Sequence, residues 1–214
     1  TLPGENRLST KAEFVLANEK LSGKIKVTLS GNQRTEFHQS YHNLPGKGQK
    51  EFLNEFLEFG NDNLVATNLR TSDLKNRELP VTIEGDVDFS NSVNTISNDK
   101  YVGVDFFPKL LDRYVPDEKR IEGYDLDDII QFEDEISLTI PADKKFIDKP
   151  DDLELKYDGY EFKGSYTING NKLLLKKTLT IKNGVIKKAA FADWTKFIES
   201  TREFSKYFVS ITQK

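Results

Sequence analysis

Three dipeptides near the C-terminus each separate two runs of residues that suit β-strands: Asp158-Gly159, Asn169-Gly170 and Asn183-Gly184. Type I′ turns need a positive φ angle at both central residues, and Asn-Gly and Asp-Gly adopt it at little cost. The spacing therefore predicts a four-stranded antiparallel meander over about 153–157, 160–168, 171–182 and 185–188. A helical pattern follows over about 190–208, with its apolar face formed by Phe191, Trp194, Phe197, Ile198, Phe204 and Phe208.

The first part of the chain predicts two strands followed by two helices. Strands are expected over 7–17 and 24–29, joined by a loop at 18–23. Apolar periodicity predicts helices over about 32–43 and 48–59. Ser30 and Gln33 have the spacing of a capping box, and Gly60 stands where a C-terminal glycine cap belongs.

Strands with long loops are expected from residue 64 to residue 140. One of them carries Val81, Ile83, Val87 and Phe89 on one face, and Gly85 interrupts it where a β-bulge is expected. The whole pattern predicts an α+β fold with mainly antiparallel sheet, meander-like or sandwich-like. A ββαα(β) unit over 1–75 would associate tightly with a β-rich part over 76–214 that ends in a packed helix.

Composition excludes several classes of function. The chain has no Cys, which excludes disulfides, thiolate zinc sites and cysteine nucleophiles. Its net charge of -4 gives no general attraction to nucleic acid. No apolar run reaches the roughly 20 residues that a membrane-spanning helix needs.

His38 and His42 are four residues apart on a predicted helix, so their rings would project from one side. That arrangement can supply two ligands to a metal ion, but no third donor is indicated. We therefore favour a polar flank of the helix, with the two histidines as weak metal candidates. No cofactor is expected.

Two patterns of carboxylates are open to a functional interpretation. Between residues 117 and 135 the chain could hold calcium, but its spacing matches no calcium loop, and a solvated loop is favoured. The acidic residues of this stretch are Asp117, Glu118, Glu122, Asp125, Asp127, Asp128, Glu133, Asp134 and Glu135. A pair of carboxylates could also hydrolyse a glycoside, although the sequence singles out no such pair among its 35 Asp and Glu residues.

Lysines and aromatic residues alternate near the predicted meander, which can indicate single-stranded nucleic acid binding. The aromatic residues share one parity, so we favour a core beneath the last helix, with the lysines on the solvent face: Lys172, Lys176, Lys177, Lys182, Lys187 and Lys188. Trp194 could stack on a sugar ring, but its place on the apolar stripe favours an anchor between helix and sheet. Trp194, Tyr101, Tyr114 and Tyr124 are the candidates for a binding surface.

The order of these elements resembles the C-terminal region of bacterial transglutaminase-like envelope proteins of unknown function. The resemblance rests on the strand pair before the helix start at Gly31, the segment Leu79-Pro80-Val81 and the strand Tyr101–Pro108. It continues with Ile136-Ser137-Leu138-Thr139-Ile140-Pro141, the Tyr160–Ile181 hairpin and the helix with Ala192-Asp193-Trp194. It implies that a transglutaminase/protease-like core precedes Thr1–Asn6.

The resemblance implies a function without catalysis in this segment. The cysteine, histidine and aspartate of the family's core have no counterpart here, because the chain has no Cys. The expected role is an accessory module that packs on the core, or presents substrate to it, in the periplasm or cell envelope. Two alternatives stay open: a glycan-binding or peptide-binding module that acts alone, and a hydrolase that uses carboxylates.

Overall fold

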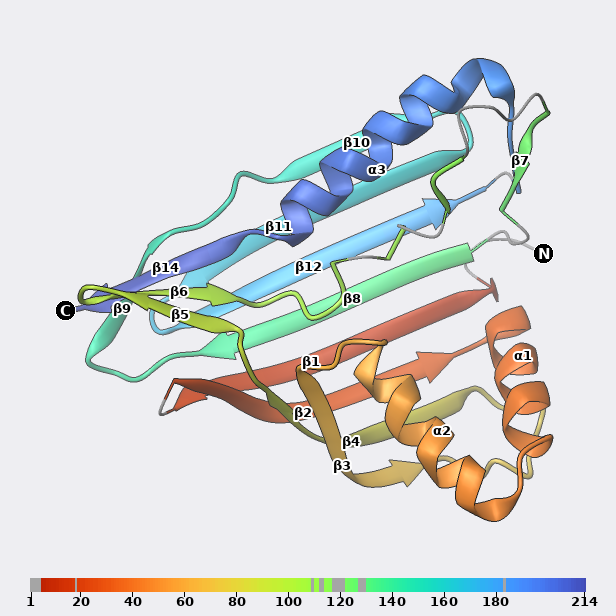
Figure 1. Cartoon of the computed structure of the whole chain (residues 1–214), viewed down its shortest axis with the longest axis horizontal. Coiled ribbons are helices and arrows are strands. Elements are labelled where there is room, and N and C mark those ends of the chain that lie inside the picture. Colours follow the sequence, from red (N-terminus) through yellow and green to blue (C-terminus); the bar gives the residue numbers. More distant parts are fainter. Residues whose placement is uncertain are drawn as a thin grey trace.

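The computed structural model describes residues 5–17, 19–108, 110–111, 114–116, 122–126, 130–182 and 184–214. It confirms the α+β class, with mainly antiparallel sheet, two helices near the N-terminus and one near the C-terminus (Figure 1). None of the helices in these ranges is long and apolar enough to cross a membrane.

The elements occur in this order: β1 (Arg7–Ala17), β2 (Lys20–Leu29), α1 (Gly31–His42), α2 (Gly46–Glu58), β3 (Leu64–Thr71), β4 (Val81–Phe89), β5 (Val93–Ile96), β6 (Asp99–Gly103), β7 (Tyr124–Asp125), β8 (Ile130–Thr139), β9 (Lys144–Asp148), β10 (Leu153–Tyr157), β11 (Tyr160–Asn169), β12 (Lys172–Ile181), β13 (Val185–Ile186), a short 3₁₀ helix (Lys188–Ala190), α3 (Phe191–Ser205) and β14 (Phe208–Gln213).

Eight strands form one large sheet in the order β10-β11-β12-β8-β1-β2-β4-β3. Neighbouring strands are antiparallel except β1 and β8, which are parallel. The boundary expected at residue 75 falls between β3 and β4, which pair with each other. The sheet therefore continues through both expected parts of the chain.

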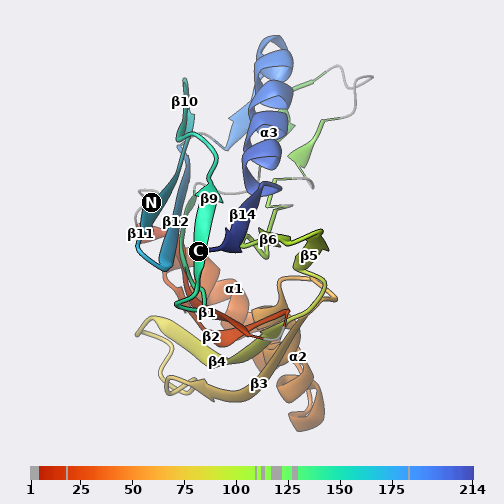
Figure 2. The same ribbon diagram turned by 90° about the vertical axis from the view of Figure 1, so that its left-hand side faces the viewer.

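One face of this sheet forms the core. Alternate residues of β1 are buried and exposed, and the same alternation runs through β2, β4, β11 and β12, as a half-buried strand requires. The three helices cover this buried face: α3 lies over the β10–β12 end, and α1 and α2 lie over the β1–β4 end (Figures 1 and 2).

A second sheet lies against the same face, in the order β5-β6-β14-β9 (Figure 2). β14 is the last element of the chain, and the sequence did not predict it, because the expected final helix extends to residue 208. The helix ends at Ser205, and Phe208 starts β14 with its side chain 40% exposed. Placing Phe208 on the buried face of the helix was therefore wrong.

The meander has three strands rather than four. β12 pairs with β8 on its second side, while β13 pairs with β7 in a separate two-stranded sheet. Asn183, in the third predicted turn, lies outside the described residues. The neighbouring position is taken by β8, which pairs with β12 along its whole length, from Ile130 to Thr139, whereas β13 has only two residues.

The two remaining turns differ from the expected type I′. Tyr157 pairs with Tyr160, and of the two residues between them Gly159 has positive φ while Asp158 does not. Asn169 itself ends β11 and pairs with Lys172, so Gly170 is the first residue of its turn, at φ 61°. One residue of positive φ in each turn is enough, because the two-residue II and II′ turns need only one.

The capping box expected for α1 is wrong, whereas Gly60 after α2 has the left-handed conformation expected of a C-terminal glycine cap, at φ 65°. Ser30 makes no side-chain cap; instead the Gln33 amide donates to Asn6 Oδ1 at 3.0 Å. The capping partner is 27 residues away, so local spacing could not indicate it. At the end of α2, Phe59 takes the left-handed conformation before Gly60 does, at φ 52°.

The irregularity expected at Gly85 lies on the partner strand. The register of β3 against β4 shifts between Thr67 and Arg70, with Asn68 at φ 52°. A side chain at Gly85 would meet Thr67 O and Leu69 Cδ2 at 2.8 Å. Gly85 therefore makes room for the bulge on β3.

Candidate functional site

The structure buries Trp194 completely. Its indole Nε1 donates to the carbonyl oxygen of Tyr114 at 2.9 Å, and Tyr160 meets the indole edge to face with centroids 4.8 Å apart. This is the packing of an anchor between α3 and β11. Trp194 offers no surface to a ligand.

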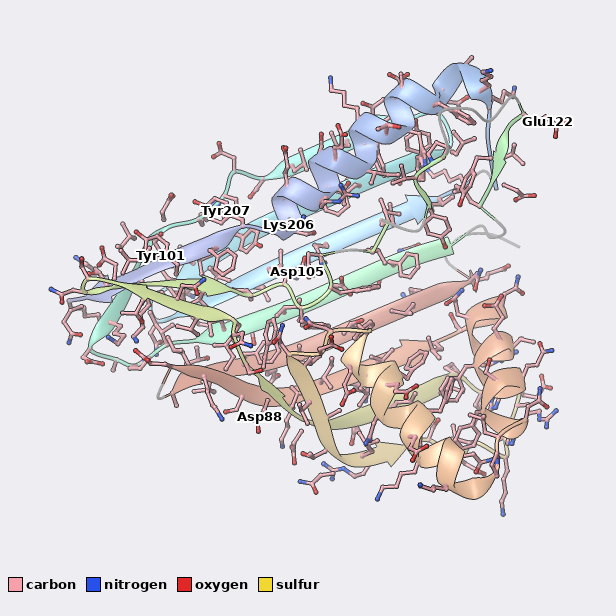
Figure 3. The ribbon with its side chains drawn as sticks, in the orientation of Figure 1. Asp88, Tyr101, Asp105, Glu122, Lys206 and Tyr207 are labelled. Carbon is pink, nitrogen blue, oxygen red and sulfur yellow. The ribbon has the colours of Figure 1, made fainter. Side chains whose placement is uncertain are left out.

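The candidate tyrosines do not form one groove. Tyr114 is buried beside Trp194, while Tyr101 and Tyr124 are half-buried on β6 and β7. These two strands lie at opposite ends of the molecule, as the labels of Tyr101 and Glu122 show (Figure 3). Tyr157 stacks on Tyr160 at 5.1 Å. These rings therefore do not form a shared binding surface.

His38 and His42 do project from one side of α1, with parallel rings 5.5 Å apart. His38 is buried and neither of its ring nitrogens has a hydrogen-bond partner, whereas His42 Nε2 donates to Leu74 O at 3.1 Å. Burial lowers the pKa of His38, and the charges of His42, Arg77 and Arg34 lower it further. Cations close by oppose binding of another cation.

Among the described residues no group of three His, Asp or Glu side chains converges on a possible metal position. Of the acidic stretch, Asp117, Glu118, Asp127 and Asp128 lie outside the described residues. Asp125 is exposed on β7, while Glu133 and Glu135 on β8 pair with Arg7 and Lys176. Asp134 points the opposite way, into the core.

Lys177 does not lie on the solvent face as expected for the lysines of the hairpin. It follows Lys176 on a strand whose residues alternate between faces, so one of the two must point inward. Lys177 Nζ lies 2.6 Å from Asp105 Oδ2 and 3.0 Å from Asp134 Oδ2, with 4% of the lysine side chain exposed. Lys177 and Asp134 are cross-strand partners on β12 and β8.

Asp105 joins the two sheets at this point. It follows β6 of the small sheet, it is buried, and its Oδ1 accepts a hydrogen bond from the Phe107 amide at 2.9 Å. Burial alone lowers the pKa of Lys177, but the two carboxylates outweigh it, so the pKa lies above the usual value. Burial raises the pKa of the Tyr166 phenol, and the charge of Asp105 raises it further. This triad links β8, β12 and the segment after β6 through buried ion pairs.

A cleft of about 470 Å³ lies directly above Asp105. Four segments that are far apart in the sequence line it: the turn after α2 (59–63), the loop between β4 and β5 (89–92), the loop after β6 (103–108) and the junction of α3 with β14 (205–208). Figure 3 shows Asp105, Lys206 and Tyr207 at this junction. None of the candidates from the sequence lines it, because the cleft is built from element ends brought together by the two sheets.

Aromatic rings form the apolar wall of the cleft. The ring centroid of Phe59 lies 5.3 Å from that of Phe106 and 5.1 Å from that of Phe107. Phe208 lies over Gly103, and a Cβ added to this glycine would meet the Phe208 ring at 3.2 Å. Phe106 is buried, whereas Phe59 and Phe107 are half-buried and Phe208 is exposed. The cleft therefore offers accessible phenyl surface.

Amide side chains form the polar wall. Asn61 Nδ2 donates to Phe106 O at 2.8 Å, and Asn61 Oδ1 accepts from the Asn63 amide at 3.1 Å. Asn91 Nδ2 donates to Asn63 Oδ1 at 2.8 Å. These bonds hold the amides in fixed orientations. Within the described part of the chain, the Asn63 side-chain NH₂ group and the Asn91 side-chain oxygen have no hydrogen-bond partner. An apolar wall with a few oriented polar groups is the usual lining of a ligand-binding cleft.

The profile of one protein family matches residues 98–207, which is about half of the chain; it is described as a domain of unknown function with a solved structure, DUF3858. The chain belongs to this family. No curated protein and no solved structure matches the sequence or the structure of this chain. The matched range contains β8, β11, β12 and α3, and β1, which lies outside it, completes the core by pairing with β8.

Proposed function

We propose that this chain is a non-catalytic accessory module of a transglutaminase-like protein of the bacterial cell envelope. It contributes a rigid surface beside a catalytic core carried elsewhere on the same protein. The resemblance of the order of elements suggests the parent protein, the core and the location. The family match supports a recurring domain whose description names no activity.

One observation favours the non-catalytic role over the carboxylate hydrolase. A glycosidase needs two carboxyl groups that face a substrate across a gap of roughly 5 to 9.5 Å. The two buried carboxylates here both bind the same Lys177 ammonium, at 2.6 and 3.0 Å, and only Asp105 reaches the cleft. The lysine engages both carboxylates in structural ion pairs.

The peptide-binding or glycan-binding alternative is favoured by the cleft, and it is compatible with an accessory role. A module can bind a ligand without changing it, and function then depends on the site rather than on the fold. The half-buried rings of Phe59 and Phe107 supply the accessible surface that Trp194 does not.

The complete reading frame tests the proposal. We expect a domain with a Cys, a His and an Asp on the N-terminal side of residue 1, and transfer or cleavage of a labelled glutamine-containing peptide by the whole protein. Replacing that cysteine by Ala should abolish the activity, while Asp105→Asn in this module should leave the rate at saturating substrate unchanged. A reading frame without such a domain, or activity that persists in the cysteine variant, would refute the proposal.

A further inference from the structure

The backbone of the cleft carries strain in the place where it presents its rings. Five non-glycine residues in the described ranges have positive φ, and two of them, Phe59 and Asn91, line the cleft. Asparagine adopts this conformation readily, but for a bulky residue such as Phe it is an outlier. Strained residues of this kind cluster at binding and catalytic sites.

Phe59 adopts the left-handed conformation although the next residue, Gly60, could adopt it without strain. Gly60 follows directly and could take the left-handed position at no cost, but both residues adopt it, at φ 52° and 65°. The result is a ring that is only half-buried beside Phe107. Core packing alone does not require this, because a core ring would be covered.

We propose that this cleft binds an extended peptide segment and takes one bulky apolar side chain between Phe59, Phe107 and Phe208. Rings of Phe favour an aliphatic or aromatic side chain, and three of them outnumber Tyr207 in the lining of the cleft. The Tyr207 hydroxyl already donates to Asp148 Oδ2 at 2.8 Å, and the single Trp is buried. The free NH₂ group of Asn63 and the carbonyl oxygen of Asn91 match one C=O and one N–H of a peptide backbone.

Charged side chains at the rim of the cleft indicate which residues flank the apolar residue of the bound peptide. Lys206 and Asp62 are exposed, both line the cleft, and no ion pair in the described part of the chain involves either. Lys206 follows α3 and Asp62 follows α2, so they approach the cleft from different elements. An acidic residue on one side of the apolar residue and a basic residue on the other complement this pair. The inference stands without the proposed parent protein.

The test is a titration of the complete ¹⁵N-labelled chain, followed by amide chemical shifts. The probe is a capped heptapeptide, Gly-Glu-Gly-Phe-Gly-Lys-Gly, and its control has Gly in place of Phe. The probe should shift the amide signals of the 59–63, 103–108 and 205–208 segments, and loss of the Phe should weaken binding by about tenfold or more. Chitotetraose, titrated in parallel, should leave these signals in place.

Two variants connect the shifts to the cleft. Phe208→Ala removes an exposed ring, and Lys206→Glu reverses a rim charge; each should weaken binding by roughly threefold or more. Lys156→Glu, an exposed lysine on the distant edge strand β10, is the matched control and should bind as the unaltered chain does. Thermal unfolding of each variant confirms that it folds. Unchanged cleft signals, equal binding of the two peptides, equal losses in Lys206→Glu and Lys156→Glu, or larger cleft shifts with chitotetraose would each overturn the inference.

Discussion

Replacing Lys177 by Met tests the buried ion pairs of Lys177 with Asp105 and Asp134, which the sequence did not predict. The substitution keeps the volume and flexibility of the side chain but removes the cation between Asp105 and Asp134. Both carboxylates then stay inside the protein without it, with their side chains 0% and 9% exposed. The adjacent Lys176 is the matched control, because its ion pair with Glu135 lies on the solvent face with side chains 58% and 44% exposed.

The two losses should differ widely. Removing one partner of a buried ion pair costs about 3–5 kcal/mol, whereas an exposed pair contributes about 0–1 kcal/mol. A loss of the first size is a large fraction of the roughly 5–15 kcal/mol that stabilises a folded protein. The variant Lys177→Met combined with Asp105→Asn and Asp134→Asn should recover most of the loss, because the amides carry no charge.

Urea unfolding followed by the fluorescence of Trp194 measures the free energy of unfolding. Lys177→Met should lower the midpoint by about 1–2 M, while Lys176→Met should leave it nearly unchanged. Because the folded pKa of Lys177 lies above its unfolded value of 10.5, its contribution is complete below pH 10.5 and is lost as the pH rises further. Equal midpoints for the two variants would refute the description of the triad.

Three further predictions concern packing, capping and titration. Gly164→Ala should cost about 1–3 kcal/mol, because its Cβ would overlap the ring of Phe204 on α3, whereas Gly46→Ala, with nothing within 4 Å, should be neutral or stabilising; a thermal unfolding series that ranks them in reverse would contradict the packing. Asn6→Ala should cost about 0.5–2 kcal/mol and Ser30→Ala less, because only Asn6 caps α1, and equal losses in urea would count against this. The lowered pKa of His38 means that the unfolded chain binds the proton first, so stability should fall as the pH drops below about 6.5; His38→Leu should remove that slope, and an unchanged slope would exclude His38 as its source.

The sequence predicted those elements whose information is local. β1 alternates over its full length, and the prediction of a strand over 7–17 is confirmed with the same bounds. The two N-terminal helices lie within two residues of their expected starts, because their apolar stripes and the breakers around Pro45 are local signals. The α+β class follows from the same patterns.

The predictions that were wrong concern residues whose structural partners are far away in the sequence. β14 was read as the end of a helix, because Phe208 continues the spacing of Phe204, and only pairing with β6 and β9 makes it a strand. The inward position of Lys177 follows from the alternation on β12, but its stability requires Asp105, 72 residues away. The cleft needs four element ends at once, so residue types alone did not indicate it.

We expect the module to bind a peptide without altering it, and a mass-spectrometric assay of the complete chain with the Phe-containing heptapeptide tests this expectation most directly. We predict that the peptide binds at the cleft and keeps its mass after prolonged incubation at neutral pH. A peptide that is cleaved or modified, at a rate that Asp105→Asn abolishes while the variant still folds, would contradict the expectation.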